Sequence, residues 1–205
     1  MTRQEVERLF TRRDGAYRFA RWGRPVVPVI FGVEEATLSV LKGACEAVVA
    51  LAGHRMAETD PEMGANLMIF FCRDWAELLQ VPDLDGLVPG LDGLVARLEA
   101  AGANQYRVFR FEATEAIRAC FLFLRMDAAL AEQPAQALAL SQMAQIILLW
   151  SEDAFATRSP LACAADSRIV LRPDIADIIR AAYDPVMPVA ANDPSHALRL
   201  AARLR

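Results

Sequence analysis

The sequence predicts an α+β fold, a small mixed sheet of about four strands packed with helices. Some segments repeat apolar residues with the helical period, whereas others alternate polar and apolar residues or form short apolar runs, as strands do. The chain has 205 residues and is 55% hydrophobic, which is enough for a substantial core. No clear linker divides it. We therefore expect a single domain over residues 1–205, with an arginine-rich helix or arm at 1–20.

The N-terminal segment predicts a helix and then a strand. The helix covers residues 2–13, with Thr2 as its N-cap and Glu5 as the capping-box partner. The run PVVPVIFG at 25–32 is typical of a strand. Pro28 cannot donate to a ladder, so this strand is expected at a sheet edge or at a bulge.

The next elements complete a predicted βαβ unit. Residues 34–52 repeat apolar side chains with the helical period, and the continuous apolar run at 66–72 indicates a strand covered on both faces. A crossover would make the two strands parallel. A turn-rich loop over 81–93 then leads into a helix at 91–101.

Two neighbouring strands and two helices are predicted in the rest of the chain. The segments 106–112 and 116–127 are separated by a short turn, which favours antiparallel pairing. The chain is expected to be irregular to about residue 172, and a helix follows at 174–182. A last helix begins at Pro194, with Asp193 as its N-cap. Arginines lie near its negative end at three positions: Arg199, Arg203 and Arg205.

Composition narrows the classes of function. The first 24 residues hold seven arginines against three acidic residues, although the net charge of the chain is −4. Nucleic acid is an unfavoured partner because the pI of about 5.3 repels a polyanion and no recognition motif accompanies the arginines. No apolar run approaches the roughly 20 residues of a membrane span. The charged start lacks a signal-peptide pattern, so we expect a cytoplasmic protein, exported only if a signal segment was removed.

Familiar catalytic and metal-binding motifs are missing from the sequence. The four cysteines match no CxxC spacing and are expected to be reduced and buried. His54 and His196 form no HExxH motif and are expected at solvated helix ends. There is no GxSxG and no GxxxxGK[ST], so no cofactor or metal is predicted.

The segment ALALSQMAQIILLW at 137–150 carries a polar stripe in an otherwise apolar helix. Ser141, Gln142 and Gln145 fall on one side at 100° per residue. Two interpretations remain open. The helix has a narrow wet face, or the stripe lines a pocket in which water or a partner satisfies the amides.

Several segments together resemble a bacterial domain-of-unknown-function family with a zincin-like, metallopeptidase-type helix. They are RWGRPVVPVIFG, GANLMIFF, the Met-Ala-Gln of the apolar helix, and RAAYDP, and the resemblance covers roughly residues 21–185. It implies a zincin-like fold in which one long apolar helix occupies the position of the active-site helix.

The resemblance also implies that the metal ligands are lost. In fuller family members the helix resembles His-Glu-Glu-x-x-Gln, with an Asn-Asp pair soon after it. Aligned on Gln145, the histidine falls on Leu140, the first glutamate on Ser141 and the second on Gln142, and the pair falls on 151–152. Leucine cannot ligate a metal. Glutamine at 142 avoids the cost of an unpaired buried carboxylate.

These observations predict a catalytically inactive zincin-like domain that binds a protein or peptide along the former cleft. The alternative is a hydrolase with a non-standard site, built from Ser141, Glu152 and Tyr183 or from an oxygen-ligated metal. The candidate pocket-lining residues are Ser141, Gln142, Gln145, Glu152 and Tyr183.

Overall fold

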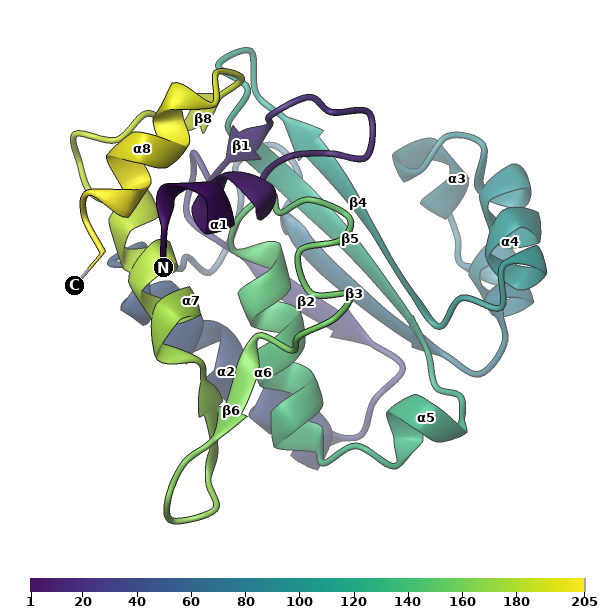
Figure 1. The fold of residues 1–205 in the computed structure, drawn as a ribbon. Helices are drawn as coiled ribbons and strands as arrows, with labels where there is room; N and C mark the ends of the chain where they lie inside the picture. Colours follow the sequence, from purple (N-terminus) through teal and green to yellow (C-terminus); the bar gives the residue numbers. More distant parts are fainter. Residues whose placement is uncertain (205) are drawn as a thin grey trace.

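The computed structural model describes residues 1–204 and has a four-stranded mixed sheet between two layers of helices (Figure 1). In the order β2-β3-β5-β4, the strands are β2 (Pro28–Phe31), β3 (Leu67–Cys72), β5 (Ile117–Arg125) and β4 (Gln105–Phe111). Two short pairs join β1 (Phe19–Ala20) to β8 (Ala190–Ala191) and β6 (Leu161–Cys163) to β7 (Ile169–Leu171). The helices are α1 (Arg3–Arg8), α2 (Glu35–Leu51), the 3-10 helix η1 (Trp75–Gln80), α3 (Leu84–Leu87), α4 (Leu91–Ala100), α5 (Ala128–Ala131), α6 (Ala135–Ile146), α7 (Pro173–Ala182) and α8 (Ser195–Ala201). The predicted α+β class and the mixed sheet of four strands are confirmed.

The sheet topology follows the predicted pairings. β2 and β3 are parallel and are joined through α2, while β4 and β5 are antiparallel. β2 lies at one edge, where the missing N–H of Pro28 removes no central ladder bond. β4 lies at the other edge.

Hydrophobic cores form on both faces of the sheet. One core joins the sheet to α2, α6 and α7, and the other joins it to η1, α3 and α4 (Figure 1). Along β5, Leu122 points into the first core, whereas Phe121 and Phe123 point into the second. Burial on both faces explains why β3 and β5 are almost continuously apolar.

The expected long apolar helix over 137–150 is wrong. α6 has 12 residues and ends at Ile146. The chain then leaves the helix, because Leu148 forms an antiparallel bridge with Arg21 and Leu149 N donates to Ala20 O at 2.9 Å. Tertiary partners at this point therefore replace further helical turns.

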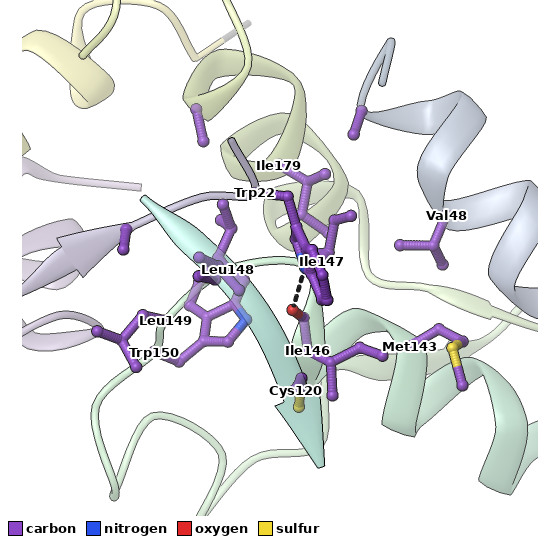
Figure 2. Packing of buried hydrophobic residues seen from close by; sticks show 14 of the residues in the cluster. Trp22, Val48, Cys120, Met143, Ile146, Ile147, Leu148, Leu149, Trp150 and Ile179 are labelled. Carbon is purple, nitrogen blue, oxygen red and sulfur yellow. Dashed lines mark hydrogen bonds between the residues drawn. The ribbon is translucent and has the colours of Figure 1, made fainter. Parts of the chain in front are cut away.

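Aromatic side chains satisfy the carbonyl groups at this helix end. Trp22 Nε1 donates to Ile146 O at 2.9 Å, as Figure 2 shows. Tyr183 Oη donates to Ile147 O at 3.0 Å. Carbonyls that further helical turns would have bonded thus find partners in the core.

The chain termini differ in detail from the predictions. The capping box of Thr2 and Glu5 is present, but α1 ends at Arg8, not at 13. Phe10 is fully buried beyond it, so the N-terminal segment packs onto the body of the protein. The expected irregular region before residue 172 contains the β6–β7 hairpin. Arg205, which is predicted near the end of the last helix, lies outside the described residues.

Two expectations about single side chains are also wrong. His196 is 3% exposed and its Nδ1 lies 2.8 Å from Tyr17 Oη, while His54 Nε2 lies 2.8 Å from Arg24 O. Both rings are held in the packed structure, not at solvated helix ends. Cys163 is exposed in the β6–β7 hairpin, which projects from the body (Figure 1). The other three cysteines are buried and free, as predicted.

No helix within residues 1–204 has the length and apolar character needed to cross a membrane.

Candidate functional site

A cleft of about 730 Å³ follows the edge strand β4. Every residue from 105 to 109 lines it, so the cleft follows five consecutive positions of the strand. Further lining comes from the segment after α6, at 149–152 and 155–156, and from two arginines of the N-terminal segment, Arg12 and Arg18. The cleft therefore combines an edge strand, a loop and basic side chains from distant parts of the sequence.

The backbone of β4 is open along its outer edge. Arg125 N donates to Asn104 O at 2.8 Å, and hydrogen-bonded pairs alternate along an antiparallel ladder. The N–H and C=O groups of Gln105, Arg107 and Phe109 consequently point away from β5. No other strand within residues 1–204 pairs with this edge.

Arg107 is a charged group without a charged partner. Its Nη2 donates to Gln105 Oε1 at 3.0 Å and to Gln142 Oε1 at 2.5 Å. Its Nε is buried and has no hydrogen-bond partner in the described part of the chain. No carboxylate of residues 1–204 forms an ion pair with it. Burial lowers the pKa of Arg107 to about 10, so the side chain is still a cation at neutral pH.

The other charges of the cleft leave it basic. Arg12 forms an ion pair with Glu152, the one acidic residue of the lining. Arg18 is exposed and forms no ion pair with any described residue. Two positive charges, those of Arg18 and Arg107, are therefore uncompensated in the cleft.

The cleft also offers apolar surface next to these charges. Phe109 and Phe111 of β4 line it together with Trp150 and Phe155 of the facing segment. The Trp150 and Phe155 rings make an edge contact with centroids 5.1 Å apart. An occupant thus meets both basic and aromatic groups.

The predicted site residues fall into two groups. Gln145 and Glu152 line the cleft, and Gln142 is 2% exposed beneath it, bonded to Arg107. Ser141 accepts a hydrogen bond from Gln145 Nε2 at 3.1 Å and is not part of the lining. Tyr183 lies elsewhere, where it fixes the end of α6 and donates to Ile147 O.

The structure corrects the reason given for glutamine at position 142. The sequence suggested that a carboxylate here would be unpaired, but Arg107 lies within hydrogen-bond distance. A glutamate would find a counter-ion, whereas the amide leaves the guanidinium charge uncompensated. Sequence reasoning missed Arg107, although a charged residue within a half-buried strand was an available signal.

Ser141, Glu152 and Tyr183, the alternative hydrolytic residues, do not form a catalytic arrangement in the structure. Neither a carboxylate nor an imidazole of residues 1–204 hydrogen-bonds to the Ser141 hydroxyl. Burial raises the pKa of Tyr183, which opposes formation of a phenolate. No group of three or more histidine, cysteine or acidic residues suited to a metal ion occurs in the described chain.

Searches of protein-family models, curated proteins and solved structures find no match to this chain.

Proposed function

We propose that this protein is a catalytically inactive binding domain that takes up an extended peptide segment along β4. One observation carries the proposal: an edge strand with unpaired backbone groups lines a cleft of about 730 Å³. An extended chain can add to such an edge, where backbone hydrogen bonds supply affinity and alternate side chains supply specificity. The volume lies within the usual range for ligand pockets.

The residues of α6 support a binding role over a catalytic one. Leu140 occupies the position of the histidine in the family that the sequence resembles, and leucine has no lone pair for a metal. Gln145 lines the cleft; its Nε2 donates to Ser141, and its Oε1 can accept a hydrogen bond from a ligand without activating water. The zincin-like ancestry is part of this proposal.

Hydrogen exchange at single amides tests this function. The probes are two acetylated, amidated hexapeptides, Thr-Phe-Thr-Gln-Thr-Thr and Thr-Phe-Thr-Glu-Thr-Thr, each at millimolar concentration. We expect at least one to slow exchange at the outward N–H groups of Gln105, Arg107 and Phe109. The amides of β2, the opposite edge, are the internal control and should not change.

N-methylated peptides give a control that leaves the protein unaltered. Methyl groups on the peptide nitrogens that face β4 should abolish protection, because they remove ladder donors. Methyl groups on the alternate nitrogens should leave protection in place. If neither peptide protects β4, or if both methylation patterns act alike, the proposed function is wrong.

A further inference from the structure

We infer that the segment bound along β4 is acidic, and that a carboxylate side chain of the peptide is recognised by Arg107 and Arg18. This inference rests on the proposed function, because it names the partner of the same cleft. The supporting observation is that the positive charges of Arg18 and Arg107 are uncompensated in the cleft. A basic cleft attracts and orients an anionic partner by charge complementarity.

Arg107 is held ready for such a group. Gln105 and Gln142 both accept from Nη2, and Gln142 Nε2 donates to Gln105 Oε1 at 3.1 Å, which fixes both amides. Nε is buried without a partner, and Nη1, which is not buried, makes no hydrogen bond to any described residue. The guanidinium thus keeps free donors while its position is set by neutral groups, and charge-assisted bonds to a carboxylate are among the strongest available.

The strand also sets the register of the ligand. Arg107 and Phe109 are two residues apart and line one cleft, so neighbouring peptide side chains on that face are also two apart. Antiparallel pairing is slightly more stable per residue than parallel pairing. With an acidic residue opposite Arg107, an apolar residue two positions earlier lies opposite Phe109. The preferred motif is apolar, any residue, then Asp or Glu.

A carboxylate on a peptide fits this cleft better than a free anion does. An acidic side chain supplies one negative charge on a chain that also bonds to the strand edge and covers the aromatic side chains. Desolvation of Arg107 costs less when a counter-ion arrives with the ligand, because the buried charge is then paired. Arg107 would thereby make the affinity for the peptide depend on its acidic side chain.

The test compares the Glu and Gln hexapeptides by fluorescence anisotropy of labelled copies. We expect the Glu peptide to bind the wild type at least tenfold more tightly than the Gln peptide. Arg107→Gln and Arg18→Ala should each reduce this ratio. Arg110→Gln is the matched control on the same strand, since Arg110 is absent from the cleft lining and donates to Leu87 O.

Gln142→Glu keeps the test decisive if Arg107→Gln does not fold. The new carboxylate would pair with Arg107 from within the protein, so the preference for the Glu peptide should disappear while the melting temperature is maintained. Equal affinities of the wild type for both peptides, together with protection of β4, would overturn the acidic partner and leave the proposed function standing. Tighter binding of the reversed peptide Thr-Thr-Glu-Thr-Phe-Thr would overturn the register. If neither peptide binds, both proposals fail.

Discussion

Removing the amide of Gln142 should weaken the fold through Arg107. In Gln142→Leu the shape of the side chain is roughly kept, but the guanidinium loses the closest of its two acceptors. Gln142 is 2% exposed, so water cannot readily take its place. A hydrogen bond to a charged group contributes about 1.5–3 kcal/mol, and we expect a loss of about 2 kcal/mol in the free energy of unfolding.

The buried charge of Arg107, in contrast, lowers the free energy of unfolding. Burial lowers its pKa from 12.5 to about 10, and at 1.36 kcal/mol per unit the cation costs the folded state about 3 kcal/mol. Arg107→Met removes this cost but leaves the buried Gln142 oxygen unpaired, at about 1–3 kcal/mol. The single variant should therefore be near wild type. In the double variant both costs are absent, so it should exceed wild type by up to about 3 kcal/mol.

Urea unfolding of the four proteins at pH 7, followed by circular dichroism, measures this cycle. Equal dependence of the unfolding free energy on urea concentration in the four proteins would show that only stability has changed. A Gln142→Leu variant as stable as wild type would contradict the contribution of this hydrogen bond. A further loss of stability when Arg107→Met is added to Gln142→Leu would contradict the cost of the buried cation.

Three further outcomes are expected. Burial lowers the pKa of His196 to about 4, so the unfolded chain takes up the proton first and stability should fall by up to about 3 kcal/mol between pH 6.5 and pH 4. The fall should be smaller in His196→Phe. The measurement is the urea midpoint at each pH, and an equal fall in the variant and the wild type would contradict the role of His196. Trp22→Phe removes the bond to Ile146 O and should cost about 2 kcal/mol in chemical unfolding; a cost near zero would show that this bond does not hold the end of α6. A thiol reagent should label Cys163 alone in the native protein, because the other three thiols are buried, and rapid reaction of a second thiol would contradict the packing.

Local patterns predicted the sheet and most helices because each strand carries its own signal. β3 reads as a continuous apolar run, and Pro28 marks β2 as an edge strand. The end of α6 carried no such signal. It is set by Trp22 and Tyr183, which lie far from it in the sequence and satisfy its last carbonyls.

The candidate site, too, depends on contacts between residues that are far apart in the sequence. The polar stripe of α6 directed attention to Gln142 and Gln145, and both lie at or beneath the cleft. Arg107, the partner of Gln142, is 35 positions from it and belongs to a strand. Only the packing of α6 against the sheet brings them together, so the uncompensated charge could not be inferred from periodicity.

The Nε–H resonance of the Arg107 side chain gives the most direct measurement of the central claim. It can be assigned by its absence from the spectrum of Arg107→Lys. During titration with the Glu hexapeptide it should shift, because a carboxylate that bonds to Nη1 changes the charge distribution of the same guanidinium at the buried Nε. A resonance that stays unchanged while the peptide binds would place the recognition of the acid elsewhere and contradict the account.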